Sequence, residues 1–113
     1  MLDTFLSNLK QNPTSVSFAD TMQIIEENYQ FTETEFKNGD TNNLAGQNSG
    51  SCKLFAFAQL HDLTQDQTLA LFGDYYRKDV LENPNGEDHQ NIRNFIKYGW
   101  QGIEFNGQAL TAK

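Results

Sequence analysis

The stretch Ser51-Cys-Lys-Leu-Phe-Ala-Phe-Ala-Gln-Leu-His61 decides the fold. Apolar side chains go almost all the way round this segment when it is drawn as a helix, and such a helix belongs at the centre of a protein. We expect Ser51 to be its N-cap and the helix to run from Cys52 to His61. The other elements should therefore surround this segment.

The residues before this stretch predict two further helices. Apolar residues at helical spacing predict one that opens the chain and ends near Asn12-Pro13. Ser17 followed by Asp20 forms a capping box, which predicts the start of a second helix. The apolar positions behind these assignments are Leu2, Phe5, Leu6 and Leu9 in the first helix, and Phe18, Met22, Ile25 and Tyr29 in the second.

The residues after the central stretch predict two more helices. Thr64 with Gln67 is another capping box, and it should open a long helix that continues to about Asn83-Pro84. A last helix is expected from about Asp88 to Tyr98, where the next residue, a glycine, is placed to end it. Its inward-facing side chains are expected to be His89, Ile92, Phe95 and Ile96.

Short β-strands are expected in two places. Alternation from Phe31 to Phe36 favours one strand, and Asn38-Gly39 after it is a turn dipeptide. Asn106-Gly107 between short alternating runs predicts a C-terminal hairpin that pairs Ile103 with Leu110. Because a two-stranded hairpin is not stable alone, it should pack on the helices or take residues 31–36 as a third strand.

These elements predict an α+β fold that is predominantly α, with about five helices and a small antiparallel β element. We expect residues 1–113 to form a single domain. Hydrophobic residues make up 37% of the chain, and a chain of this length can bury well over half of its unfolded surface.

Charge and cysteine content exclude several classes of protein. The 8 basic and 15 acidic residues give a net charge of −7, which repels the phosphate backbone of a nucleic acid. No apolar stretch approaches the ~20 residues that span a bilayer, and from the residues at the start of the sequence we expect no secretory signal. Cys52 is the only cysteine, so no internal disulfide can form and a reducing compartment is expected. We expect neither nucleic acid nor a membrane as partner. We also expect no cofactor and no metal, since the histidines and carboxylates show no recognised metal-ligand spacing.

The polar segment from Asn38 to Ser51 is expected to be one long loop, and such loops are often functional. Gly46, Gly50, Ser51 and the first amides of the central helix, together with Lys53, could form a nest for a phosphate or carboxylate. The sequence therefore indicates an anion-binding site at the start of the central helix.

Cys52 allows a second interpretation of the same region. At the first turn of a helix, the dipole and free backbone N–H groups lower the pKa of a thiol. His89 is the credible general base, with Asp88 or Asn91 to orient it, and Gln47 could donate to an oxyanion. These groups would make a cysteine-dependent hydrolase or transferase.

Structural explanations of these residues remain open. Free cysteine is among the most buried residue types, so Cys52 could be an inert core thiol. His89 could be a hydrogen-bonded core or helix-terminal histidine. Gln47 could satisfy backbone groups of the loop, and Lys53 could be a solvated charge.

A polar patch interrupts the predicted long helix at residues 73–79. Gly73 costs about 1 kcal/mol relative to Ala in a helix interior, so it could be present to allow close approach of another backbone. Asp74 is spaced to pair with Arg77 or Lys78. If this patch is partly buried, it becomes a specific polar site.

Several motifs together resemble the HopJ type III effector family. They are Asn42-x-x-Ala-Gly-Gln-Asn-x-Gly-Ser-Cys-Lys53, Phe72–Leu81, Asp88–Phe95, Gly99-Trp-x-Gly-Ile103 and Gln108-Ala-Leu110. The resemblance covers the chain from about Phe18 onward. It implies a small bacterial protein, named after effectors that type III secretion delivers into host cells. The bacterial cytoplasm is the expected location, with delivery into a host as a further expectation. The family has no agreed biochemical activity, so no catalytic residues are carried over.

We therefore predict a binding or interaction module of the HopJ type, in which the motif segments converge on one polar site. The expected partner is an unidentified protein or a small anionic ligand. The predicted ligand-binding residues are Gly46, Asn48, Gly50, Ser51, Lys53, Asp74, Tyr75, Arg77 and Arg93. In the cysteine-dependent alternative the catalytic residues are Cys52, His89, Asn91 and Gln47.

Overall fold

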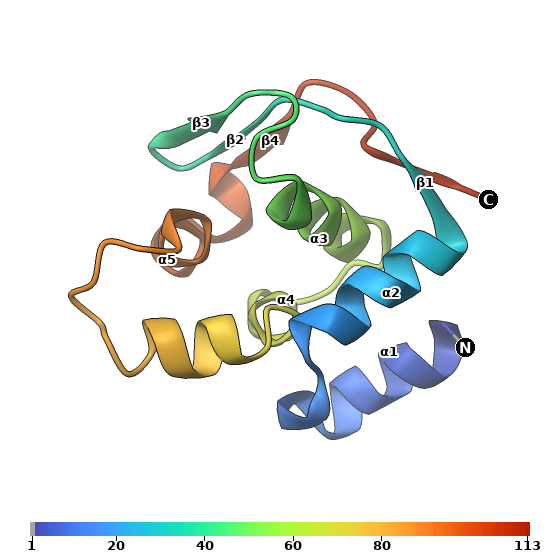
Figure 1. The fold of residues 1–113 in the computed structure, drawn as a ribbon, viewed down its shortest axis with the longest axis horizontal. Helices are drawn as coiled ribbons and strands as arrows, with labels where there is room; N and C mark the ends of the chain where they lie inside the picture. The colour runs from blue at the N-terminus through green and yellow to red at the C-terminus, as the bar shows by residue number, and fades with distance from the viewer. Residues whose placement is uncertain (1) are drawn as a thin grey trace.

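Helix α3 (Ser49–Leu60) runs through the middle of the molecule, with the strands along one side and the other helices around the rest (Figure 1). The structure is a computed structural model that describes residues 2–113. The predicted central helix is confirmed, since Cys52 and residues 54–58 are buried. The predicted N-cap is wrong. The helix begins two residues before Ser51, and Asn48 is its N-cap, with a left-handed φ of 51° that Asn tolerates better than most residues.

Two helices and a short 3₁₀ turn precede α3. Helix α1 (Leu2–Gln11) leads through η1 (Pro13–Ser15) to α2 (Phe18–Asn28). The predicted capping box is confirmed, because the Ser17 side chain accepts from the Asp20 N–H and the Asp20 side chain accepts from the Ser17 N–H. Both helices were correctly expected from local patterns.

The predicted long helix after residue 64 is wrong, because the chain turns sharply at Gly73. Helix α4 (Gln65–Ala70) has the expected capping box, but it is followed by a separate π-helix, η2 (Tyr75–Val80). Gly73 has a φ of +63°, and a Cβ on it would lie 2.7 Å from the backbone nitrogen of Phe18. The glycine thus ends one helix, permits the close approach to α2 and sets the direction of η2.

Helix α5 (Gln90–Tyr98) also begins later than predicted. His89 is its N-cap and has a left-handed φ of 51°, so the preceding residues form a loop. Gly99 ends the helix with a φ of 64°, as expected, and the 3₁₀ turn η3 (Gly99–Gly102) follows. On the predicted inward face Ile92 and Phe95 are buried, whereas Ile96 is 39% exposed and does not belong to the core.

The α+β class is confirmed, and the strands form two small antiparallel sheets. The first sheet pairs β1 (Tyr29–Phe31) with β5 (Leu110–Ala112). The second has the order β3 (Thr41–Asn43), β2 (Phe36–Asn38), β4 (Ile103–Phe105). In Figure 1 the red C-terminal segment runs beside the green and cyan strands of both sheets.

Three predictions in this region are wrong, and the first two fail because strand partners lie far apart in the sequence. The C-terminal hairpin does not form, because β4 pairs with β2 and β5 with β1. Residues 31–36 are two strand ends in different sheets, not one strand. The segment from Asn38 to Ser51 contains β3 and the start of α3, which leaves only residues 44–48 between them. The turn at Asn38-Gly39 is confirmed, since it lies between the paired strands β2 and β3.

The core is rich in aromatic side chains and is centred on Phe55 of α3. The ring of Phe55 lies 5.0–6.3 Å, centroid to centroid, from those of Phe36, Phe72, Phe95 and Trp100. These rings come from β2, the turn after α4, α5 and η3, so one side chain joins most of the elements. Such contacts add to the burial energy by specific edge and offset geometry.

Candidate functional site

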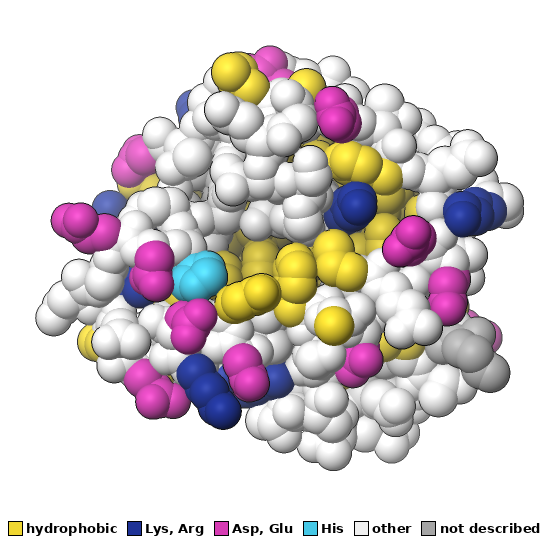
Figure 2. All heavy atoms as spheres, in the orientation of Figure 1, with side chains coloured by type: hydrophobic (Ala, Val, Ile, Leu, Met, Phe, Trp, Pro, Cys, Tyr) yellow, Lys and Arg dark blue, Asp and Glu magenta, His cyan; other side chains and the backbone are white. Residues whose placement is uncertain are grey.

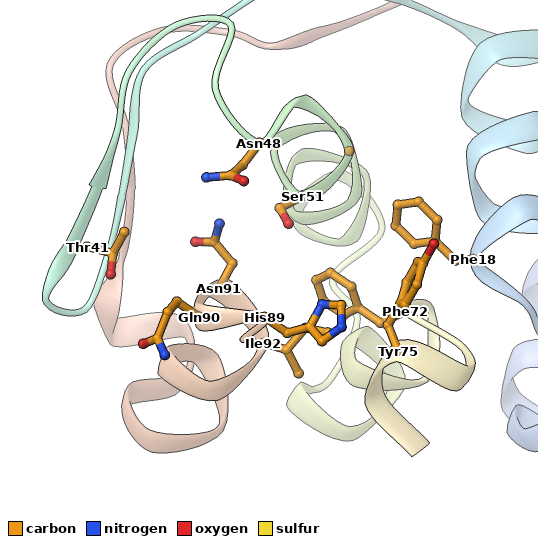
Figure 3. Close-up of a pocket in the computed structure, with 11 residues that line it drawn as sticks. Phe18, Thr41, Asn48, Ser51, Phe72, Tyr75, His89, Gln90, Asn91 and Ile92 are labelled. Carbon is orange, nitrogen blue, oxygen red and sulfur yellow. The ribbon is translucent and has the colours of Figure 1, made fainter. Parts of the chain in front are cut away.

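A cavity of about 350 Å³ lies where the N-termini of α3 and α5 and the start of η2 meet (Figure 3). This volume is within the usual range for a small-molecule site. Figure 2 shows hydrophobic side chains gathered in a hollow in the middle of the corresponding face. The residues that line the cavity are Phe18, Thr41, Asn48, Gly50, Ser51, Phe72, Tyr75, His89, Gln90, Asn91 and Ile92.

Two helices begin at this cavity, and neither has a side-chain cap. Asn48 and His89 are the N-caps of α3 and α5, and neither side chain accepts a hydrogen bond from its own helix. The first backbone N–H groups of each helix have no acceptor within the helix. Because each N-terminus carries a partial positive charge, both helices favour an anionic group between them.

One wall of the cavity is aromatic. The ring of Tyr75 lies 5.2 Å from that of His89 and 5.2 Å from that of Phe18, and Phe18 stacks on Phe72 at 6.3 Å. His89 Nε2 is 3.0 Å from Asp79 Oδ2, which holds the imidazole in place. Tyr75 is 45% exposed, so a ring face remains open to a ligand.

The opposite wall is polar and is built on a buried amide network. Asn91 is 7% exposed and its Oδ1 accepts from Asn38 Nδ2 at 3.0 Å and from Asn43 Nδ2 at 3.2 Å. Asn43 Oδ1 in turn accepts from Asn91 Nδ2 at 3.0 Å and from Asn48 Nδ2 at 2.7 Å. These bonds fix the amides of Asn48 and Asn91 before any ligand arrives.

Charged side chains are not part of the lining. Within residues 2–113, no Asp, Glu, Lys or Arg lines the cavity, and His89 is its one basic side chain. The remaining polar groups are neutral amides and hydroxyls, among them Thr41, Ser51 and Gln90. The electrostatic preference of the site therefore comes mainly from the two helix ends.

Cys52 does not contribute to this cavity. Its side chain is 1% exposed, and Sγ donates to the backbone oxygen of Thr34 at 3.5 Å, whereas His89 is bonded to Asp79. Burial raises the pKa of the Cys52 thiol, although the Thr34 hydrogen bond and the charge of Lys53 act in the opposite direction. The position of the thiol does not favour the activation expected at a helix N-terminus, because Cys52 lies one turn inside α3 and is buried.

The other residues expected around Cys52 have structural roles. Gln47 Oε1 accepts from the Leu44 N–H at 3.1 Å and so closes the loop before α3. Gly46 has a left-handed φ of 89° in the same loop. Lys53 Nζ lies 5.0 Å from the ring centroid of Phe31. None of these three residues lines the cavity.

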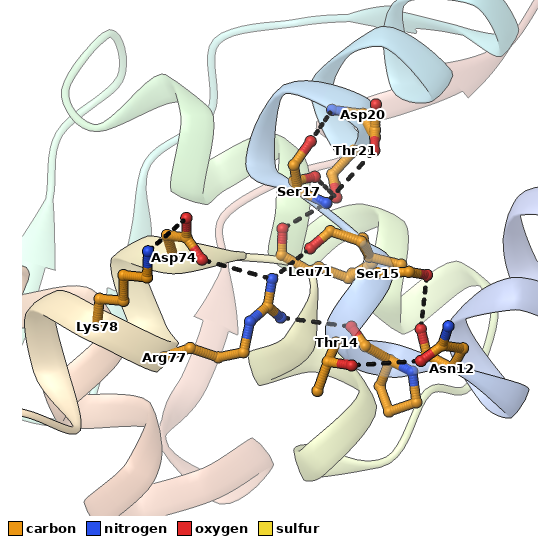
Figure 4. A network of polar contacts seen from close by, with 12 residues as sticks. Asn12, Thr14, Ser15, Ser17, Asp20, Thr21, Leu71, Asp74, Arg77 and Lys78 are labelled. Atoms are coloured by element: carbon orange, nitrogen blue, oxygen red, sulfur yellow. Dashed lines mark hydrogen bonds and ion pairs between the residues drawn. The ribbon is translucent and has the colours of Figure 1, made fainter.

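The polar patch at residues 74–78 joins η2 to the N-terminal segment. Arg77 donates to the backbone oxygens of Val16 at 2.7 Å and Pro13 at 3.3 Å, and Asp74 lies 3.8 Å from both Arg77 and Lys78 (Figure 4). Asp74 and Arg77 line a neighbouring depression, which shares Phe18, Phe72 and Tyr75 with the cavity. Arg77 therefore serves to hold η2 in position.

Arg93 holds the loop before α5. It donates to the backbone oxygens of Asn83 and Asp88 at 2.8 and 2.6 Å, and it pairs with Asp88 Oδ1 at 2.7 Å. The hydrogen bond from Arg93 lowers the pKa of the Asp88 carboxyl. The loop in turn places His89 and α5 at the cavity.

The structure thus brings together part of the predicted site. Three motif segments meet at the cavity. The first contributes Asn48, Gly50 and Ser51, the second contributes Tyr75, and the third contributes His89 and Asn91. The sequence prediction missed its other residues, which are Phe18, Thr41, Phe72, Gln90 and Ile92. The apolar ones look like ordinary core positions. Gln90 lies inside the motif Asp88–Phe95 and Thr41 directly precedes the motif that begins at Asn42, and those places were the available signal.

Two general features complete the description of the site. Across residues 2–113, no helix is both long enough and apolar enough to cross a bilayer. The same residues contain no cluster of three or more His, Cys, Asp or Glu side chains arranged to hold a metal ion.

The fold and the cavity define a small α+β domain with a mixed polar and aromatic pocket at the start of two helices. The family model for the HopJ type III effector protein matches residues 2–110, and the chain belongs to this family. It is also similar to a solved structure described as the crystal structure of an unknown function protein, VPA0580. The two share 52% sequence identity and a TM-score of 0.99, over 100% of this chain and 94% of that one. A search of curated proteins found no match.

Proposed function

We propose that this HopJ family protein is a binding module that takes a small molecule with one anionic group in the cavity between α3 and α5. The observation that carries the proposal is the meeting of two helix N-termini without side-chain caps at a cavity of about 350 Å³. The anionic group would accept from the first backbone N–H groups of both helices.

The net charge of −7 disfavours a polyanionic partner. A long polyanion would be repelled by the whole surface, whereas a single anionic group inside the cavity meets the local field of the helix ends. A bacterial cytoplasm, in which small phosphorylated and carboxylated metabolites are present, is the location we propose.

The cysteine-dependent alternative is not favoured by any contact of Cys52. A nucleophile needs a base within hydrogen-bonding reach, and the thiol and the imidazole of His89 are bonded to different groups. Burial also raises the pKa of the thiol, which lowers the thiolate fraction at neutral pH.

The proposal can be tested by titrating ¹⁵N-labelled protein with inorganic phosphate and following backbone amide signals. The amides of Gly50, Ser51, Gln90 and Asn91 should shift together and saturate, because they lie at the two helix ends. The experiment should extend to about 10 mM phosphate, which exceeds the millimolar Kd of a weak small ligand. Shifts that are absent there, or spread evenly over all helix starts, would overturn the proposal.

A charge-reversal variant sharpens the test. Ser51→Asp places a carboxylate in the first turn of α3, where a negative charge stabilises the helix, but where it should repel the bound anion. We expect phosphate affinity to fall by about tenfold or more, equivalent to about 1.4 kcal/mol. Ser7→Asp, an identical change on the exposed face of α1, is the matched control and should leave the affinity unchanged.

A further inference from the structure

The polar wall of the cavity has unused hydrogen-bonding groups on two fixed amides. All hydrogen-bonding positions of the Asn43 side-chain amide are occupied, because its oxygen accepts two hydrogen bonds and its nitrogen donates to Phe36 O and Asn91 Oδ1. Among the described residues, Asn48 therefore keeps a free Oδ1 and one free N–H, and Asn91 keeps one free N–H. A donor and an acceptor side by side on an amide match the edge of a nucleobase.

The aromatic wall lies across the cavity from these amides. In Figure 3, Phe18 and Tyr75 are on the right, while Asn48 and Asn91 are farther to the left. Tyr75 presents an exposed ring beside the imidazole of His89. Stacking on such rings is the usual way in which proteins bind an unpaired base.

The charge of the cavity limits the number of phosphates. Each helix N-terminus is equivalent to roughly half a positive charge, so the two together offset about one of the roughly two negative charges that a phosphomonoester carries at pH 7. Within residues 2–113 no Lys or Arg side chain lines the cavity, as a triphosphate would require. The cavity volume of about 350 Å³ also suits one nucleotide rather than a polymer.

We propose that the ligand of this cavity is a nucleoside monophosphate. Its base stacks on Tyr75 and His89, the base edge bonds to the amides of Asn48 and Asn91, and its phosphate lies between the two helix ends. This inference rests on the proposed binding function and names the ligand class.

The test is isothermal titration of the full chain with inorganic phosphate, ribose 5-phosphate and the four common nucleoside monophosphates. At least one nucleotide should bind about tenfold more tightly than ribose 5-phosphate. If phosphate and ribose 5-phosphate bind but no nucleotide binds more tightly, the nucleotide inference is overturned and the anion site stands. If no compound binds, phosphate included, both proposals are overturned.

Variants at the aromatic wall check the stacking directly. Tyr75→Leu should weaken binding of the preferred nucleotide by about fivefold or more, as expected when a ring that stacks on a base is removed. Tyr75→Phe keeps the ring and should stay within about twofold of wild type. Neither variant should change binding of inorganic phosphate. Equal nucleotide affinity for the Leu and Phe variants would refute the stacking geometry.

A variant at the amide wall checks the base edge. Asn48→Gly removes the amide but keeps a residue that adopts the left-handed conformation, and it should reduce nucleotide affinity more than ribose 5-phosphate affinity. Asp62→Gly is the matched control, because Asp62 has the same φ of 51° at the other end of α3. An equal loss for both ligands in Asn48→Gly would refute the role assigned to the amide.

Discussion

Replacement of Gly73 by Ala should destabilise the protein more than the same change at Gly46. Both glycines have a positive φ, 63° and 89°, so both alanine variants pay the left-handed conformational cost of about 1–2 kcal/mol. Both also gain the same small benefit from a less flexible unfolded chain. The two positions differ in what a new Cβ would meet.

At Gly73 the added Cβ would lie 2.7 Å from Phe18 N and 3.0 Å from Ser17 Cα, which are backbone atoms at the start of α2. At Gly46 the nearest atom is a side-chain oxygen of Glu33 at 3.3 Å, which can move aside. Forcing a group into packed backbone costs about 1–3 kcal/mol. We therefore expect Gly73→Ala to be less stable than Gly46→Ala by about that amount.

Urea unfolding followed by far-UV circular dichroism measures this difference. Since a domain of this size loses roughly 4 °C in Tm for each kcal/mol, thermal melts should place Gly73→Ala about 4–12 °C below Gly46→Ala. Equal stabilities, within about 0.5 kcal/mol, would show that the approach of the two backbones at Gly73 is not a real constraint.

Two further predictions follow from the buried titratable groups. Native protein should react slowly with iodoacetamide near pH 7, because burial raises the pKa of Cys52. Mass spectrometry should show fast alkylation only after unfolding in urea. Rapid labelling of the native state would support the cysteine-dependent alternative. Burial lowers the pKa of His61, whose Nε2 is 2.7 Å from the hydroxyl of Tyr29, so the unfolded chain binds a proton before the folded one as the pH falls. The free energy of unfolding should therefore decrease as the pH falls below about 6.5, and it should level off below the folded pKa of His61. The urea midpoint of His61→Gln should not show this decrease. Identical pH dependences for wild type and variant would exclude a contribution from His61.

Helices whose signals are local could be predicted from the sequence. The capping boxes at Ser17 and Thr64 depend on residues three positions apart, and both formed as expected. The break at Gly73 could not be predicted, because it depends on contact with Ser17 and Phe18, which are distant in the sequence. The same apolar spacing continues on both sides of that break.

Strand pairing was harder to predict from the sequence than helix position. Asn106-Gly107 has the composition of a hairpin turn, yet the Asn106 side chain donates to Glu35 Oε1 at 2.7 Å and the flanking strands pair elsewhere. A local turn signal cannot compete with long-range pairing that buries Ile103 and Leu110.

The candidate site was predictable where its residues were polar. Asn48, Ser51, Tyr75, His89 and Asn91 stood out as polar groups within otherwise apolar or loop segments, and they meet at the cavity. The aromatic wall was not predictable, since a partly exposed ring and a core ring have the same spacing in a sequence. The amide network was missed because Asn in a short strand is normally assigned to a turn.

The pairing of β4 and β5 with β2 and β1 has a consequence for how the protein is made. More than half of the 113 residues separate these partners, so a nascent chain on the ribosome carries unpaired strand edges until residues 103–112 emerge. Closing such distant contacts is slow, and exposed edges invite association with other chains. Synthesis of residues 103–112 should therefore be the event that completes folding, and molecules whose translation stops shortly before residue 103 should aggregate or be degraded.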